Sequence, residues 1–192
     1  WRETEDVSTN YNLLYAVSTD ATGTAFENSR GEEYSLPVTE ATAETICQIP
    51  QGSALINQTS MTVDGEDLPY IISYWRVEGV VQYNIIRYTD SRWIVYNTNI
   101  RSTDFELTGG GTRQLPCARP QILVRGSGDE TEVCVFFRDE ERESRASAAK
   151  LIFQGGEMVT EEIMDITAGD MGEWEPVYDI SLWQKTGKIQ LF

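Results

Sequence analysis

The chain has 192 residues, and 40% of them are hydrophobic, enough to bury a single-domain core. Its 15 basic and 31 acidic residues leave a net charge of −16, which argues against general nucleic-acid binding. No run of 18 apolar residues occurs, so we predict no membrane span. The sequence contains no His, so neither a Ser-His-Asp triad nor a His-based zinc site can be built from this chain alone. We therefore predict no metal site and no cofactor.

Strand signals dominate the chain. Short β-branched and aromatic runs alternate with clusters of Gly, Asp, Asn and Ser, which predicts an all-β fold. The central part predicts two successive units of four strands each. The expected strands are Ile56–Val63, Pro69–Val77, Val80–Tyr88 and Arg92–Thr98, then Pro120–Val124, Glu132–Arg138, Ala146–Phe153 and Glu157–Ile166.

The flanking segments resemble incomplete units of the same kind. Strands are expected at Asn12–Val17 and Tyr34–Leu36 before the two units, and at Pro176–Leu182 and Lys188–Phe192 after them. Thr39–Gln48 is expected to form a short helix capped by Thr39. Because the chain begins and ends within a motif, we expect it to be a segment of a longer protein or one of two chains that complete each other.

Three stretches share one design, in which an aromatic residue and an Arg end a predicted strand and an acidic residue follows. They are Trp1-Arg2-Glu3, Trp75-Arg76-Val77-Glu78 and Phe137-Arg138-Asp139-Glu140, and their Arg positions are 74 and 62 residues apart. Recurrence at this scale in strand-like sequence predicts a β-propeller of four-stranded antiparallel blades. The expected organisation is a partial blade 1–36, a connection 37–54, a blade 55–99, a loop 100–117, a blade 118–168 and a partial blade 173–192.

Antiparallel strands place the start of each first strand and the end of each second strand on the same face. Asn57, Gln58, Arg119 and Glu175 precede or open the first strands. We therefore expect these four residues to gather with Arg2, Arg76 and Arg138 on the face where propellers bind ligands. A planar guanidinium binds carboxylate or sulfate through two parallel hydrogen bonds, which suits an acidic sugar.

Each of these residues also has a purely structural interpretation. Repeated Arg and Glu at blade ends can form salt bridges between neighbouring blades. Trp75, Tyr74 and Tyr83 are candidates for stacking on a sugar ring, but strand alternation supports core packing for them equally well.

Several longer motifs occur along the chain in a fixed order. They are Ile56-Asn57-Gln58-Thr59-Ser60-Met61-Thr62-Val63-Asp64, Tyr74-Trp75-Arg76, Gly109-Gly110-Gly111-Thr112, Arg119-Pro120-Gln121, Phe137-Arg138-Asp139-Glu140-Glu141-Arg142 and Trp174-Glu175-Pro176 with Tyr178-Asp179. These motifs resemble the BNR-repeat propeller family, which includes ulvan lyases and related polysaccharide lyases of marine and gut bacteria. The resemblance covers nearly the whole chain.

The resemblance implies that the chain is the C-terminal part, about half, of a seven-bladed propeller. The missing N-terminal blades would be supplied in cis or by a second chain. It also implies β-elimination next to a uronic acid, in which Arg neutralises the carboxylate and a Tyr or His transfers the proton. Tyr74, Tyr83 and Tyr11 are the catalytic candidates. Family members often carry His at the positions of Tyr11 and Asn84, and Cys near Leu14, so a metal held there in relatives is not expected here.

The leading hypothesis is therefore part of a secreted or periplasmic bacterial propeller that cleaves or binds an acidic polysaccharide such as ulvan. Arg76, Arg119, Arg138 and Arg2 would bind the acid group, while Asn57, Gln58, Glu175 and Trp75 complete the sugar site. A non-catalytic carbohydrate-binding or surface-display propeller is the second hypothesis, favoured by the absence of His. A propeller scaffold for protein partners is the third.

Overall fold

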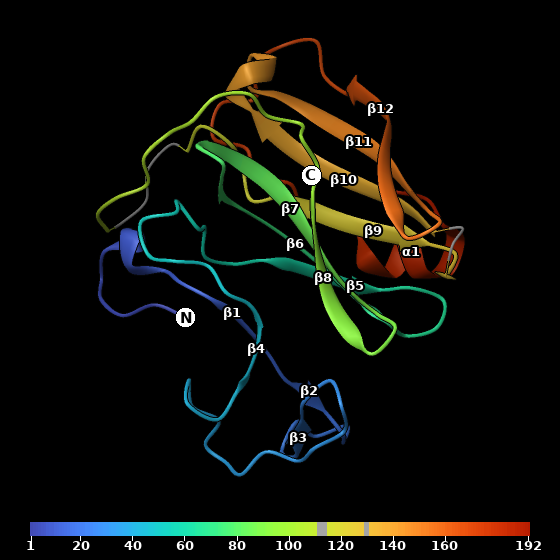
Figure 1. Ribbon diagram of the computed structural model, residues 1–192. Coiled ribbons are helices and arrows are strands. Elements are labelled where there is room, and N and C mark those ends of the chain that lie inside the picture. The colour runs from blue at the N-terminus through green and yellow to red at the C-terminus, as the bar shows by residue number, and fades with distance from the viewer. Residues whose placement is uncertain (111–114, 129–130) are drawn as a thin grey trace.

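The computed structural model describes residues 1–110, 115–128 and 131–192. Two four-stranded antiparallel sheets dominate it, with strand orders β5-β6-β7-β8 and β9-β10-β11-β12 (Figure 1). These sheets confirm the predicted all-β fold of four-stranded antiparallel units. Residues 111–114 of the expected loop, including Gly111 and Thr112 of the glycine motif, lie outside the described residues.

The first sheet comprises β5 (Ser60–Val63), β6 (Pro69–Val77), β7 (Val80–Thr89) and β8 (Arg92–Asn97). The second comprises β9 (Gln121–Arg125), β10 (Thr131–Asp139), β11 (Arg145–Gln154) and β12 (Glu157–Asp165). All eight strands coincide closely with predicted strands, although β5 begins four residues later than expected. Among the described residues, each sheet is a simple up-and-down meander, because short turns join antiparallel neighbours.

The two sheets pack face to face over one shared core. Alternate side chains of the long strands β6 and β7 point toward alternate side chains of β10 and β11. The fully buried members include Tyr70, Ile72, Tyr74, Tyr83, Ile85, Ile122, Val133, Val135, Phe137, Leu151 and Phe153. The first strands of the two sheets also meet, because the Ser60 hydroxyl accepts from the Ile122 amide at 3.3 Å. The starts of β5 and β9 consequently lie side by side, which places the residues just before them at one site.

The N-terminal part forms smaller elements that cover the other face of the first sheet. A 3-10 turn, η1 (Val7–Thr9), precedes β1 (Leu13–Tyr15), which pairs with β4 (Glu44–Cys47). A separate two-residue pairing joins β2 (Val17–Ser18) to β3 (Phe26–Glu27). In Figure 1 strands β2 and β3, drawn in blue, lie below the two large sheets. The expected strand at Tyr34–Leu36 is wrong, because no strand forms there in the described chain.

The segment that was predicted to form a helix has the wrong type. Thr39–Gln48 forms no helix, because the turn closed by Thr39 and Thr42 ends at once. The residues that follow include the β-branched Thr45 and Ile46, and they pair with β1 as strand β4.

The C-terminal segment carries a helix where two strands were predicted. Helix α1 spans Ile180–Thr186. Asp179 caps its N-terminus by accepting from the Leu182 amide, and Gly187 ends it at φ 65°, in the left-handed region that favours glycine. Only an isolated bridge between Tyr178 and Leu191 remains of the predicted strand pairing. A second 3-10 turn, η3 (Glu140–Arg142), follows β10.

Candidate functional site

A polar cavity of about 430 Å³ lies at the end of the sheets where β5 and β9 begin. It brings together five of the residues that were predicted to bind substrate: Arg2, Asn57, Gln58, Arg119 and Glu175. The remaining walls come from the N-terminal segment, the loop after β8 and the C-terminal segment. They include Val7, Ile56, Leu107, Thr108, Gly109, Gly110, Leu115 and Glu173. We call this cavity the polar pocket.

Arg119 lines one wall of the polar pocket, where Glu175 and Asn57 hold its side chain. Its Nη1 lies 3.1 Å from Glu175 Oε1, and its own amide donates to Glu175 Oε2 at 2.7 Å. Its Nε donates to the Asn57 carbonyl at 3.2 Å. Glu175 thus offsets much of the positive charge of Arg119, and the pair is fixed in place before any ligand arrives.

The guanidinium of Arg2 makes fewer hydrogen bonds within the protein than that of Arg119. Its Nε donates to the Thr4 carbonyl at 2.7 Å. Among the described residues, its two Nη nitrogens have no hydrogen-bond partner, and the side chain is exposed. Arg2 therefore presents an open guanidinium fork to the polar pocket, which is the geometry that carboxylate and sulfate groups require.

Asn57 and Gln58 form the floor beside Arg119. Gln58 has φ 67°, in the left-handed region that non-glycine residues rarely adopt. This strained backbone turns the chain sharply just before β5 and leaves both amide side chains exposed. Side-chain amides both donate and accept hydrogen bonds, so they are suited to sugar hydroxyl groups.

One wall of the polar pocket belongs to a segment that is fastened at both ends. We call residues 104–110 the strap. Arg76 holds its start: Nε donates to Asp104 Oδ1 at 2.8 Å and Nη2 donates to the Phe105 carbonyl at 2.9 Å. Asp6 holds its end, because Asp6 Oδ1 accepts from the Gly109 amide at 2.8 Å. Gly110 lies so close to the N-terminal segment that a Cβ there would be 3.3 Å from the Glu5 carbonyl oxygen.

The structure corrects the expected role of Arg76. Its Nη1 donates to the Gly52 carbonyl, outside the strap, at 2.6 Å, and Glu106 of the strap accepts from its Nη2 at 2.8 Å. The guanidinium is thus occupied by protein groups, and the residue does not line the polar pocket. Arg76 therefore holds the strap in position.

Arg76→Ala should consequently destabilise the protein by about 1–3 kcal/mol, because hydrogen bonds to a charged group are lost together. Hydrogen exchange should become faster across residues 104–110. Urea unfolding combined with exchange mass spectrometry measures both effects. The variant Arg76→Lys keeps the charge but lacks the planar guanidinium, so its stability and its exchange rate should lie between those of the unsubstituted protein and Arg76→Ala. Unchanged stability and exchange with complete loss of ligand binding would instead show that Arg76 contacts the ligand.

Four other predicted site residues are buried, so their expected roles are also corrected. Tyr74 and Tyr83 are 0% exposed and pack edge to face in the core. Burial raises the pKa of both phenols well above 10.0, which opposes proton transfer. Trp75 is 5% exposed and packs in the cluster on the other face of the first sheet. Arg138 is 1% exposed and donates to the carbonyls of Trp174 and Leu115, both at 3.0 Å.

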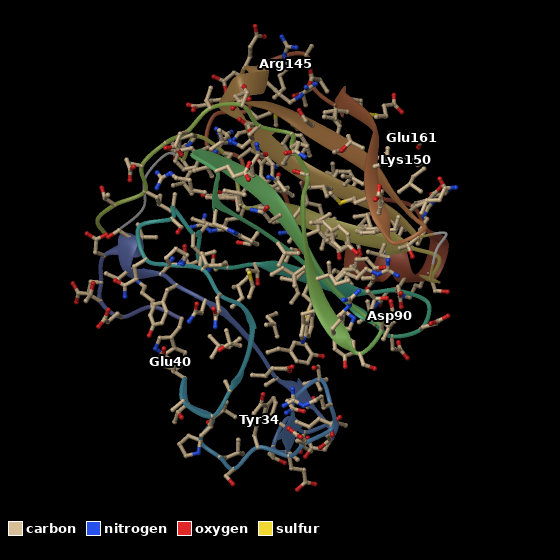
Figure 2. The ribbon with its side chains drawn as sticks, in the orientation of Figure 1. Tyr34, Glu40, Asp90, Arg145, Lys150 and Glu161 are labelled. Atoms are coloured by element: carbon tan, nitrogen blue, oxygen red, sulfur yellow. The ribbon has the colours of Figure 1, made fainter. Side chains whose placement is uncertain are left out.

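Tyr11 is the remaining catalytic candidate, and it lies outside the polar pocket. A hydrogen bond with Glu40 raises its pKa to about 12. Glu40 lies on the turn before β4 and is labelled in Figure 2. A phenol with this pKa stays protonated at neutral pH, so Tyr11 is not suited to act as a general base. Among the described residues, no cluster of three or more acidic or Cys side chains could hold a metal ion.

Asp6 anchors the end of the strap, and the sequence did not reveal this contact. It lies in an irregular segment, and its partner Gly109 is 103 residues away, so no local pattern could link them. Hydrogen bonds from Ser8 and Gly109, together with the charge of Arg2, lower the pKa of Asp6 below its ordinary value of 3.8.

The lowered pKa of Asp6 predicts how the strap responds to acid. A carboxyl whose pKa is depressed by folding contributes its full stabilisation above pH 3.8, and this contribution is lost as the pH falls through the lower folded value. The Gly109 amide resonance should therefore titrate with a midpoint below 3.8 in an NMR experiment. In Asp6→Asn this step should be absent. A midpoint at or above 3.8, or an identical titration in Asp6→Asn, would contradict the role of Asp6 as the strap's anchor.

Comparisons with known proteins bear on the family and the fold of the chain. Residues 1–100, more than half of the chain, match the family model described as BNR repeat-containing family member. The chain belongs to this family. The resemblance predicted from the motifs is thereby confirmed. No curated protein matches the sequence.

Two solved structures share the fold. One is an ulvan lyase of polysaccharide lyase family PL25, with a TM-score of 0.57 and 16% identity over 80% of this chain and 33% of that chain. The other is polysaccharide lyase Uly1, with a TM-score of 0.51 and 12% identity over 92% of this chain and 35% of that chain. At these identities the likeness establishes the fold alone, and this chain spans about a third of the length of either structure. Among the described residues, no helix is long and apolar enough to cross a membrane.

Proposed function

We propose that the polar pocket binds an acidic polysaccharide, with uronate or sulfate groups as in ulvan, within a polysaccharide lyase-like propeller. The observation that carries this proposal is the open fork of Arg2, which faces a pocket lined with side-chain amides and a second Arg. In this arrangement Arg2 takes the acid group. Asn57, Gln58 and Glu175 take sugar hydroxyl groups, and Arg119 holds Glu175 in position.

The overall charge of −16 does not oppose an anionic ligand at this site. Screening at 0.1 M salt confines charge effects to roughly 10 Å, so nearby groups dominate. Glu173 and Glu175 balance the two Arg charges of the pocket, and Glu175 is already paired with Arg119. Arg2 is consequently the group that distinguishes an acidic sugar from a neutral one.

Cleavage by β-elimination is the second candidate function, and the likeness to two polysaccharide lyases favours it. In that reaction the Arg fork would stabilise the enolate-like transition state once the uronate is bound. The proton acceptor would come from outside this chain, because the sequence has no His and its three Tyr candidates are buried or lie outside the pocket. Further blades in the same polypeptide or in a second chain would supply it, and the protein would act outside the cell, where such polysaccharides occur.

The test uses the protein expressed from its complete gene. Isothermal titration with ulvan should show binding, and carboxyl-reduced, desulfated ulvan should bind much more weakly. Equal affinity for the neutral polymer would overturn the proposal. Ultraviolet absorbance recorded in the same samples separates the two functions: a rising signal from unsaturated uronate shows β-elimination, whereas binding with a flat trace shows a carbohydrate-binding propeller.

A further inference from the structure

A second polar cavity lies at the end of the two sheets opposite the polar pocket. Its volume is about 420 Å³, and ligand sites in proteins begin at about 300 Å³. Its walls come from β7, β8 and the segments that follow β5, β9 and β11. They include Leu68, Arg87, Thr89, Tyr96, Gly128 and Gly156. We call it the distal cavity, and Figure 2 labels Asp90 at its rim.

Arg87 reaches the distal cavity from β7 and is buried although it carries a charge. The residue is 4% exposed. Its Cζ lies over the rings of Tyr70 and Phe153, 5.2 Å and 5.0 Å from their centroids. Each ring attracts a cation through its face, and the two rings come from different sheets. The position of the guanidinium is therefore fixed by packing before any ligand arrives.

The hydrogen bonds of Arg87 leave most of its donors unused in the part of the chain that the structure describes. Its Nη2 donates to the Gly128 carbonyl at 3.0 Å. Its Nε is buried and has no hydrogen-bond partner there, and no described carboxylate forms an ion pair with the guanidinium. A guanidinium has five N–H donors, and a buried charge is ordinarily paired with an opposite one. Arg87 is therefore suited to an acceptor that brings negative charge.

The other two buried Arg side chains of the described residues differ from Arg87 in this respect. Arg101 forms an ion pair with Asp139. Arg138 uses both Nε and Nη2 to donate to backbone carbonyls, each at 3.0 Å. The protein thus satisfies the Nε of Arg138 and the charge of Arg101 from within, and it does neither for Arg87.

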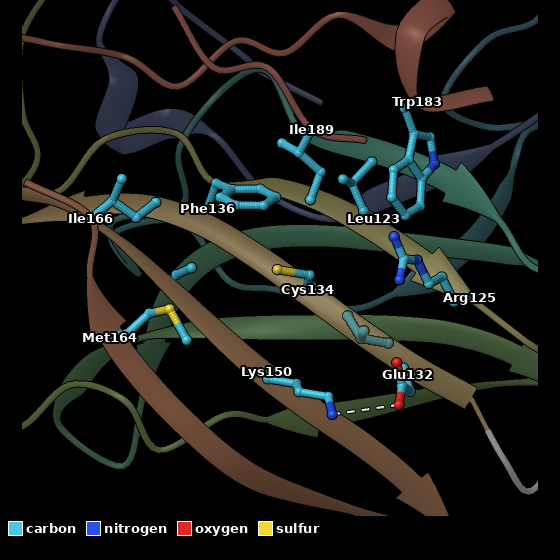
Figure 3. Close-up of a pocket in the computed structure, with 12 residues that line it drawn as sticks. Leu123, Arg125, Glu132, Cys134, Phe136, Lys150, Met164, Ile166, Trp183 and Ile189 are labelled. Carbon is cyan, nitrogen blue, oxygen red and sulfur yellow. Dashed lines mark ion pairs between the residues drawn. The ribbon is translucent and has the colours of Figure 1, made fainter. Parts of the chain in front are cut away.

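The cavity in Figure 3, on the face of the second sheet away from the first, shows the opposite situation. Its walls are almost entirely apolar, and the cations at its rim are occupied. Lys150 lies 3.4 Å from Glu132, as the dashed line marks. Arg125 donates to the Gly187 carbonyl at 2.6 Å. These cations are therefore engaged by protein groups, whereas Arg87 is not.

The other charges near the distal cavity do not cancel that of Arg87. Glu66, Asp90 and Arg92 lie exposed at its rim, where solvent and salt screen them. Asp64 is the buried carboxylate at this end of the first sheet. Its Oδ1 accepts from the amides of Glu66 and Leu68 at 2.9 Å and 3.0 Å, so it is engaged in its own turn. The buried charge that faces the distal cavity is that of Arg87.

We propose that the distal cavity binds an oxyanion group, a sulfate or a carboxylate, through the Nε side of Arg87. Two oxygen atoms of the group would accept from Nε and from the remaining Nη2 hydrogen, which is the parallel arrangement that a guanidinium makes with such groups. Because Arg87 extends from β7 to the Gly128 segment that follows β9, the bound group would also brace the ends of the two sheets. The inference does not depend on what the polar pocket binds.

Isothermal titration of sodium sulfate into the protein expressed from its complete gene tests this proposal. The parent protein carries Arg2→Gln so that the polar pocket contributes little, and sodium chloride keeps the ionic strength constant. We expect saturable binding that weakens by more than ~10-fold when Arg87→Gln is added, because a hydrogen bond to a charged group is lost. Adding Arg125→Gln instead removes the same charge away from the distal cavity and should leave the affinity unchanged.

Thr89→Trp gives a second test that leaves Arg87 in place. Thr89 lines the distal cavity and is partly exposed, so an indole at this position should block entry. Sulfate binding should then fall even though the guanidinium is intact. This variant decides the question if Arg87→Gln is too unstable to titrate, and unchanged sulfate binding in Thr89→Trp would overturn the proposal.

Two competitors distinguish the source of the oxyanion, and both outcomes support the site. Displacement of sulfate by sodium glucuronate alone shows that a free acid enters, whereas displacement by ulvan as well shows that the same group on a polymer does. No saturable sulfate binding in the Arg2→Gln parent overturns the proposal, because water then suffices for Nε. Equal affinity with and without Arg87→Gln also overturns it. Neither result bears on polysaccharide binding at the polar pocket, which is measured with Arg2 in place.

Discussion

Arg2→Gln should weaken binding of an acidic polysaccharide by about 10- to 100-fold, since a hydrogen bond to a charged group contributes about 1.5–3 kcal/mol. The loss should appear with the acidic polymer only, because Gln retains hydrogen bonds to hydroxyl groups but has no charge. The fold should remain intact: the side chain is exposed, and the Thr4 carbonyl is its single partner among the described residues. Isothermal titration of both proteins at fixed salt measures the difference.

Arg92→Gln is the matched control for Arg2→Gln. Arg92 is also an exposed Arg, but it lies at the start of β8, beside the turn that follows β7 and away from the polar pocket. Removing its charge changes the net charge by the same amount, so any long-range electrostatic effect should be equal. If both variants weaken binding equally, the polysaccharide responds to overall charge and the polar pocket is not its site.

The second large effect concerns the buried ion pair between Arg101 and Asp139, which are 0% and 1% exposed. It joins the loop after β8 to the end of β10, and the Tyr83 hydroxyl donates to the same carboxylate at 3.1 Å. Arg101→Leu leaves Asp139 buried without its cation, and this should cost about 3–5 kcal/mol of unfolding free energy. Urea unfolding monitored by tryptophan fluorescence measures the change.

Arg145→Leu provides the comparison for Arg101→Leu. Arg145 pairs with Asp165 at 3.0 Å near the surface, where such pairs contribute about 1 kcal/mol or less. The double variant Arg101→Leu with Asp139→Leu should recover much of the loss, because no buried charge is then left without a partner. Glu141, which lies 3.5 Å from Arg101, is partly exposed and still accepts from the Ser102 and Thr103 amides. A single Arg101→Leu variant as stable as Arg145→Leu would contradict the view that this pair ties the two sheets together.

The parts of the fold that were predictable depend on periodicity along the chain. In β6 and β10 the residues that face the shared core alternate, and short turns join β6 to β7, β7 to β8 and β11 to β12, so the strands and their antiparallel order could be inferred. The polar pocket followed from the same rule, because antiparallel pairing places Asn57 and Arg119 at one end of neighbouring sheets. Helix α1 was missed because its caps, Asp179 and Gly187, act within a segment too short to show helical periodicity.

The unpredicted features are decided by packing rather than by pattern. Alternation indicates which side chains share a face, but it does not tell which face is covered. It therefore could not decide between a ligand contact and core packing for Tyr74 and Tyr83, both of which are in the core. Likewise, an Arg at a strand end can turn toward solvent or toward nearby carbonyls. Arg138 turns inward because the Leu115 and Trp174 carbonyls lie within its reach.

A crystal structure of the complete protein with a bound uronate oligosaccharide tests the central claim most directly. We predict that the sugar lies in the polar pocket, with its carboxylate within hydrogen-bonding distance of the Arg2 Nη nitrogens and its hydroxyl groups on Asn57 or Gln58. Density for the oligosaccharide at another surface, with the polar pocket empty at saturating ligand, would contradict the assignment.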